Sequence, residues 1–260
     1  MRDKGVVFIL STCRSMLNYA ARQRFLPPYA RNPFSELSIE RMRIEDSKPT
    51  DILAPEEEVK FLEACDRWQL RIFAMLAFTG MRPGELCHLL LDDVDWDNRL
   101  LHIRNRPELG WKTKTRNERR VYLVHGVLDA AREAAGERTE GPLFLARKYA
   151  DGLSRPPLAG MDATWLASEL QDRTDAASAS FGDRSQRELG AREAKHLWRD
   201  MGATNPRDLR REFMRVTKRM GRAELTCPKL WRHQMTTAMQ EAAVDPIARK
   251  EIVGHTQLST

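Results

Sequence analysis

The chain has 260 residues, 42% of them hydrophobic and 31% charged, which is enough for one large or two smaller globular domains with a charged surface. The net charge of +6 and the isoelectric point near 9.3 favour an acidic partner, with nucleic acid first among them. The four cysteines are scattered without a CxxC pair and no apolar run reaches membrane-spanning length, which argues against a disulfide framework, a zinc site and a membrane protein. We therefore expect a cytoplasmic protein with reduced thiols.

The first predicted helix covers about residues 11–25, where apolar positions recur at helical spacing. Prolines follow it, and the polar segment 35–51 then has the composition of a linker. A single helix cannot bury its own apolar face, so this one must dock on something else. We expect it to be the last piece of a domain whose beginning is missing.

The middle of the chain changes from helical to strand spacing. A helix is predicted to begin at Pro55, where three glutamates follow in the first turn. Further on, Val94–Trp96, Leu100–Ile103 and Arg120–Val124 have the composition of strands, and a basic loop, Trp111–Asn117, precedes the third. We expect a small antiparallel sheet of about three strands, supported by helices.

A helical corner lies between these two regions. Gly80 is placed to end an apolar helix, because glycine readily adopts the left-handed conformation of a C-terminal cap. Pro83 suits the first turn of a new helix, which puts Arg82 at or beside its N-cap. Free N–H groups and a guanidinium there can bind a phosphate, and Glu85 could hold the arginine in place. The alternative is an ordinary corner with a solvated arginine.

The C-terminal half is predicted to be helical, with one ambiguous stretch. Helices are expected near 128–135, from Pro206 to Met220, from Lys229 to Ala243 and from Pro246 to Gly254. For residues 147–205 the mixed order of small and charged residues leaves two alternatives open, a mobile insertion or weak helices.

Two basic segments are candidate DNA contacts. The helix from Pro206 carries a run of cations, and the loop before the third strand carries more. A solvated charged face is the usual interpretation of such runs, and contact with the DNA backbone is the more specific one. The candidate residues are Arg207, Arg211 and Arg215 in the helix, and Lys112 and Arg116 in the loop.

Four ordered motifs resemble those of the tyrosine recombinases, the phage-type integrases. Thr79–Leu86 is similar to the family's first-arginine motif, and Lys114 falls at the position of its catalytic lysine. Arg232-His233 resembles the second-arginine helix, and Ile252–His255 resembles the closing Gly-His motif. Taken singly, Lys114 suits an exposed hairpin, Arg232 a helix surface and His255 a helix C-terminus. Their order along the chain favours the family.

The resemblance implies a fold and a domain organisation. The fold is mainly α, of the α+β type, with a small three-stranded antiparallel sheet. Residues 1–34 would be a remnant of the N-terminal domain that clamps DNA, and residues 35–54 a linker. Residues 55–260 would be the integrase catalytic domain without its C-terminal tyrosine segment. The chain therefore looks cut at both ends.

The resemblance also implies a chemistry in which DNA strands are cleaved and rejoined at specific sites through a phosphotyrosyl intermediate. Arg82 and Arg232 would clamp the oxygens of the scissile phosphate, and Lys114 would protonate the leaving oxygen as general acid. His255 would hydrogen-bond the phosphate and Glu85 would orient its surroundings. No metal or cofactor is required. The expected partner is double-stranded DNA, with a homo-oligomer on DNA as a further expectation and no membrane.

Two features depart from the family pattern. Lys229 stands where a histidine is usual, and lysine is a base only when its pKa is depressed. No tyrosine lies at the family's nucleophile position; the tyrosines are Tyr19, Tyr29, Tyr122 and Tyr149. A non-catalytic DNA-binding remnant of an integrase is therefore the main alternative. A DNA- or RNA-binding regulator with accidental motif matches is a third one.

Overall fold

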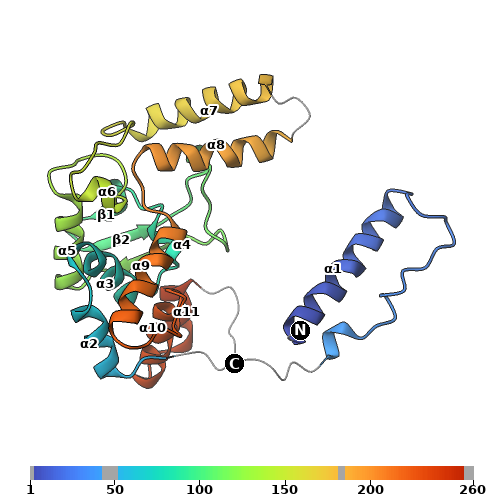
Figure 1. Ribbon diagram of the computed structural model, residues 1–260, viewed down its shortest axis with the longest axis horizontal. Coiled ribbons are helices and arrows are strands. Elements are labelled where there is room, and N and C mark those ends of the chain that lie inside the picture. Colours follow the sequence, from blue (N-terminus) through green and yellow to red (C-terminus); the bar gives the residue numbers. More distant parts are fainter. Residues whose placement is uncertain (1–2, 43–51, 181–184, 255–260) are drawn as a thin grey trace. The chain divides into compact units, whose positions relative to one another are not determined.

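The computed structural model describes residues 3–42, 52–180 and 185–254 (Figure 1). The chain divides into two compact units, residues 1–50 and 51–260. It is mostly helical with one small sheet, which confirms the predicted fold class. No helix within the described ranges is long and apolar enough to cross a membrane.

The first unit consists of α1 (Asp3–Arg22) and a short 3₁₀ helix, Ile39–Arg41. α1 begins at Asp3, earlier than the sequence predicted. Arg14 holds the following segment on this helix: its Nε donates to the Phe34 carbonyl at 2.8 Å, and its guanidinium pairs with Glu40 at 2.5 Å. The first residues of the expected linker, 35–42, therefore pack against α1.

The second unit contains the sheet, in the order β1 (Val94–Asp95), β2 (Leu100–Ile103) and β3 (Arg119–Tyr122), all antiparallel. Leu101 lies opposite Val94 on one side and Val121 on the other, and all three are buried. Because side chains alternate along a strand, this face of the sheet is against the core. The predicted sheet is confirmed, although β3 begins and ends earlier than expected.

Helices surround the sheet. Their bounds are α2 (Pro55–Glu63), α3 (Arg67–Thr79), α4 (Pro83–Leu86), α5 (His125–Ala135), α6 (Arg147–Ala150), α7 (Ala163–Ser180), α8 (Gln186–Asp200), α9 (Pro206–Arg219), α10 (Leu230–Glu241) and α11 (Pro246–Val253). The stretch that the sequence left open thus contains α6, α7 and α8. Figure 1 shows α7 and α8 running side by side.

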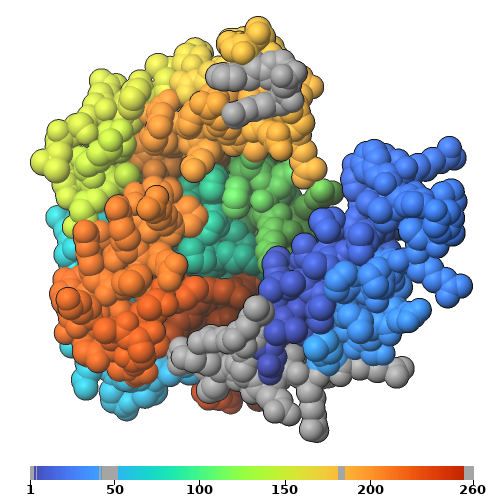
Figure 2. All heavy atoms as spheres, turned by 45° about the vertical axis from the view of Figure 1, so that its right-hand side comes forward, coloured from blue at the N-terminus to red at the C-terminus, as the bar shows by residue number. Residues whose placement is uncertain are grey.

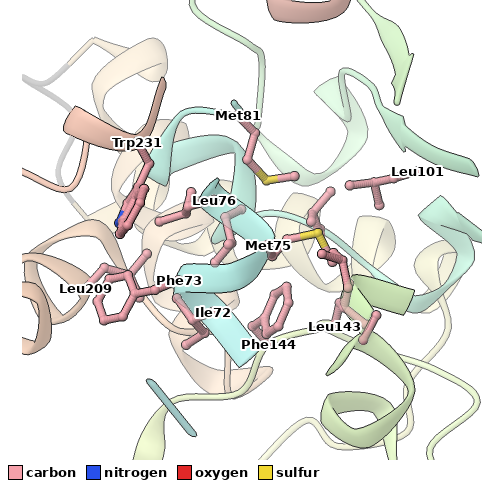
Figure 3. Packing of buried hydrophobic residues seen from close by; sticks show 14 of the residues in the cluster. Ile72, Phe73, Met75, Leu76, Met81, Leu101, Leu143, Phe144, Leu209 and Trp231 are labelled. Atoms are coloured by element: carbon pink, nitrogen blue, oxygen red, sulfur yellow. The ribbon is translucent and has the colours of Figure 1, made fainter. Parts of the chain in front are cut away.

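The core of this unit is built around α3 (Figure 3). Asp66 caps its N-terminus by accepting the Gln69 N–H, and Gly80 ends it in the left-handed conformation, with φ of 59°. The Phe61 ring packs edge-on against Phe73 at 5.3 Å and against Trp231 of α10 at 5.0 Å. Burying each such side chain contributes roughly 1.5–3 kcal/mol. This packing holds the middle of α3 and the start of α10 against α2.

A second apolar cluster joins the α7–α8 pair to the loop between β2 and β3. The Trp198 indole N–H donates to the Leu109 carbonyl at 3.0 Å. Gly110 follows with a φ of 69°, and a Cβ there would lie 2.4 Å from the Cβ of Ala194. Only glycine therefore permits this close approach of the loop to α8.

Candidate functional site

The helical corner at Arg82 forms as its residue types predict. Arg82 is the extended N-cap of α4, and Pro83 occupies the first helical position. Glu85, in the same turn, accepts the Arg82 backbone N–H at 2.9 Å and its guanidinium at 2.7 Å. Because α4 is a single turn, its dipole is small, and the positive charge at this corner comes mainly from the guanidinium.

Arg232 of α10 reaches the same corner from far along the chain. Its Nη1 donates to the Gly80 carbonyl at 2.9 Å, and the residue is only 2% exposed. Its neighbour Trp231 is fixed in the core, so the backbone holds Arg232 toward α3. The structure therefore brings Arg82, Glu85 and Arg232 together, and Arg232 does not line an exposed helix surface.

Arg119 of β3 is a third arginine at this site, one that the sequence analysis did not select. Its Nη2 donates to Glu85 Oε2 at 2.7 Å and its Nε donates to the Ile252 carbonyl at 3.0 Å. It therefore links α4, β3 and α11. The available signal was strand alternation, since Arg119 shares the face of the buried Val121, where a charge is unusual.

The electrostatics of this arginine cluster (Arg82, Arg119, Arg232 and the carboxylate of Glu85) are unbalanced. Burial alone would raise the pKa of Glu85, but the bonds and charges of Arg119 and Arg82 outweigh it and lower that pKa. Burial, and then repulsion by Arg82, lower the pKa of Arg232 to about 10. Three cations and one carboxylate leave two excess positive charges. Within the described structure the buried Nη2 of Arg232 has no hydrogen-bond partner, so the cluster can accept an oxyanion.

Lys114 is exposed in the loop between β2 and β3, and no hydrogen bond or ion pair involves it among the described residues. The base of its loop is nevertheless anchored beside α4. Trp111 stacks on His88 with ring centroids 3.7 Å apart, and His88 Nδ1 is 2.7 Å from the Gly84 carbonyl. The loop that carries Lys114 therefore starts next to the Arg82 corner, without a contact of Lys114 to the arginines.

Lys229 comes shortly before Arg232 in the sequence, and His255 directly follows Gly254. Lys229 is exposed at the N-cap of α10, and burial followed by the Lys229 charge lowers the pKa of His233. His255 lies outside the described residues. The residue before it, Gly254, caps α11 with a φ of 72°, and a Cβ there would lie 3.0 Å from the Arg119 guanidinium. The chain thus passes directly beside Arg119 at this point.

The predicted DNA contacts all have exposed side chains: Arg207, Arg211 and Arg215 on α9, and Lys112 and Arg116 between β2 and β3. The three arginines recur every four residues and so share one side of the helix. Arg211 pairs with Asp208 at 2.6 Å and Arg215 pairs with Glu212. Each of these two pairs is intrahelical, and the arginines remain accessible to a phosphate.

The fold and the arginine pair are those of a tyrosine recombinase catalytic domain. Residues 51–260 match the model of the phage integrase family, and the chain belongs to that family. The resemblance found in the sequence is thereby confirmed.

Relatives and solved structures agree with this assignment. The chain is 32% identical over 109 residues to IntQ of Escherichia coli strain K12, a protein described as defective, covering 40% of this chain and 26% of that protein. It is 24% identical over 229 residues to an integrase/recombinase of Escherichia coli, covering 80% of this chain and 57% of the relative. The chain thus spans little more than half of that relative's length, and about a quarter of IntQ.

Two solved structures share the fold. The Tn1549 transposon integrase superposes with a TM-score of 0.65 at 17% identity, covering 99% of this chain and 73% of that one. Lambda integrase gives a TM-score of 0.58 at 13% identity, covering 99% and 74%.

Proposed function

We propose that the arginine cluster binds a phosphate of double-stranded DNA, and that this domain serves site-specific DNA recombination and integration. The observation that carries the proposal is the unused binding capacity of the cluster. Two positive charges are uncompensated, and Arg232 has a buried donor without a partner in the described structure. A phosphate oxygen supplies both the negative charge and the acceptor that are lacking.

The geometry suits stabilisation of charge that develops during phosphodiester cleavage. Arg82 and Arg232 would bind the non-bridging oxygens, where negative charge increases in the transition state. Glu85 fixes the Arg82 fork, and Arg119 fixes Glu85 in turn. For Lys114 the proposed role is general acid on a loop that closes over the DNA. These donors belong to the chain itself, and no metal or cofactor enters the proposal.

Tyr122 of β3 does not face the arginine cluster and so does not supply the nucleophile of the phosphotyrosyl step there. Tyr122 alternates with Arg119 along β3 and so projects from the opposite face, where the Arg99 guanidinium lies 5.0 Å from its ring. Tyr122 is therefore not placed to attack a phosphate bound at the cluster. The second candidate function is binding of DNA without strand cleavage, for which the cations of the arginine cluster are sufficient.

The known complexes support the proposed partners. The Tn1549 integrase was solved in complex with transposon right end DNA, and lambda integrase as a dimer bound to a core site. By analogy we propose duplex DNA as the partner, a homo-oligomer on DNA, and the cytoplasm as the location. We also propose that residues 1–34 belong to a DNA-clamping domain, that residues 35–54 connect it to the rest of the chain, and that residues 55–260 belong to the catalytic domain.

Binding can be tested without the cognate site. A labelled duplex of arbitrary sequence is titrated at low salt with the chain, with Arg82→Gln and with Arg232→Gln. Each variant should bind about tenfold more weakly, which corresponds to roughly 1.4 kcal/mol for one lost phosphate contact. Arg132→Gln is the matched control, because it removes one exposed charge from α5 away from the cluster. Equal affinity of all four proteins would refute the phosphate site.

Cleavage is tested separately. The chain is incubated with a pool of nicked suicide duplexes that carry randomised sites, and covalent protein–DNA adducts are sought on denaturing gels. The non-catalytic function predicts no adduct from these 260 residues. An adduct that disappears in Tyr122→Phe would show that strand cleavage proceeds through an unexpected nucleophile.

A further inference from the structure

A cavity of about 750 Å³ lies between α8 and the start of α9, apart from the arginine cluster. Its walls come from Ala191, Ala194 and Trp198 of α8, and its floor from His88 and Gly110. In Figure 2 the orange atoms of this region lie beside the teal and green atoms of the segment between α4 and β3. Sites for small organic ligands have about this size.

Two polar groups in the cavity lack partners. Thr204 is 3% exposed, and its hydroxyl has no hydrogen-bond partner among the described residues. His88 uses Nδ1 toward the Gly84 carbonyl, so Nδ1 carries the proton and Nε2 carries a free lone pair. Burial lowers the pKa of His88 to about 4, which keeps the ring neutral near pH 7. The cavity thus offers one acceptor and one hydroxyl to a ligand.

The rim of the cavity is basic. Lys195, Arg199, Arg207 and Arg211 line it, with Asp208 as the only carboxylate of the lining. Asp208 is already paired with Arg211, and Arg199 is paired with Asp200. Lys195 and Arg207 have no ion pair in the described part of the chain. An anionic group at the rim would therefore meet two uncompensated cations.

We propose that this cavity binds one nucleotide, with the base inside against Trp198 and the Thr204 and His88 polar groups, and the phosphate at Lys195 and Arg207. A nucleobase is flat and presents N–H donors and ring acceptors on one edge, which fits His88 Nε2 and the Thr204 hydroxyl. Its source is either a free nucleotide or a nucleotide turned out of a DNA strand. Binding of a nucleotide that is still part of a DNA strand rests on the proposed function, whereas binding of a free nucleotide does not.

The test uses the full chain and three probes. These are deoxyadenosine monophosphate, a fully paired duplex, and the same duplex with one unpaired adenine. Ala191→Trp fills the mouth of the cavity from an exposed helical position, so the fold is kept. Ala176→Trp makes the same change at an exposed position of α7 outside the cavity. Thr204→Val removes only the unpaired hydroxyl.

The chain should bind the bulged duplex about tenfold more tightly than the paired one, and Ala191→Trp should abolish that difference while Ala176→Trp keeps it. Thr204→Val should reduce it about fivefold, the effect of one lost hydrogen bond. If the chain binds deoxyadenosine monophosphate and Ala191→Trp removes this binding, a free nucleotide is a ligand. If the chain binds the bulged duplex but not the monophosphate, the ligand is a nucleotide of a DNA strand. The proposal is overturned if the chain prefers neither probe, or if Ala191→Trp retains the preference. Affinity for the paired duplex reports separately on the proposed function.

Discussion

The replacement Arg232→Met separates the binding role of this arginine from its effect on stability. In the folded chain its pKa is lowered from 12.5 to about 10, so the folded state binds this proton more weakly than the unfolded state. The charged guanidinium therefore destabilises the fold at every pH below about 10, and the cost disappears as the pH rises from that value toward 12.5. A neutral side chain of similar length removes the cost at neutral pH.

Two opposing contributions set the change in the free energy of unfolding that Arg232→Met should cause. A downward shift of about 2.5 pKa units corresponds to roughly 3 kcal/mol of destabilisation. The hydrogen bond from Arg232 to the Gly80 carbonyl, which involves a charged donor, stabilises by about 1.5–3 kcal/mol and is lost in the variant. Arg232→Met should thus lie between unchanged stability and a gain of about 1.5 kcal/mol, whereas truncating a buried side chain usually costs about 2–5 kcal/mol.

Urea denaturation with and without sulfate provides the assay. An oxyanion that binds the folded cluster at ten times its Kd stabilises the unchanged chain by about 1.4 kcal/mol, and Arg232→Met should lose most of this gain. Arg138→Met is the control, because Arg138 is also partly buried with a lowered pKa, yet its guanidinium donates to four backbone carbonyls. It should destabilise by about 2 kcal/mol or more. The reasoning is refuted if Arg232→Met loses more than about 2 kcal/mol and sulfate still stabilises it fully.

Three further changes test the neighbouring contacts. Glu85→Gln should lower the free energy of unfolding in urea by about 3 kcal/mol, because it leaves buried arginines without their carboxylate. The pKa of Glu85 is lowered in the folded state, so the stabilisation by its carboxylate should be complete above about pH 4.5 and be lost as the pH falls through the folded-state pKa. Arg119→Lys keeps the charge but loses the guanidinium that joins Glu85 to α11, so the affinity for duplex DNA should fall about tenfold although urea unfolding shows an intact fold. Unchanged affinity would exclude a positioning role for Arg119. Arg211→Ala with Arg215→Ala should reduce the salt slope of duplex binding by about 1.8 if both contact phosphates, and a slope as steep as that of the unchanged chain would return α9 to a solvated face.

Much of the local structure was predictable because its signals act over a few residues. Gly80 adopts the left-handed conformation and Pro83 starts α4, as their stereochemistry requires. Asp245 caps α11 through the Ile247 and Ala248 N–H groups. Where the local signal was mixed, between residues 147 and 205, the prediction stayed open, because α7 and α8 bury their apolar side chains against each other and against Leu109, which is distant in the sequence.

The sequence by itself determined the elements outside residues 147–205, the order of the motifs and the cationic side chains that the family uses. It selected Arg82, Glu85 and Arg232 from residue types at helix ends and from resemblance. Only the tertiary structure decided that Arg119 completes the cluster and that Arg232 is buried with an unused donor. The physical reason is range: caps and strand alternation depend on neighbouring residues, whereas the charge balance of a buried site depends on side chains that packing brings together from α4, β3 and α10.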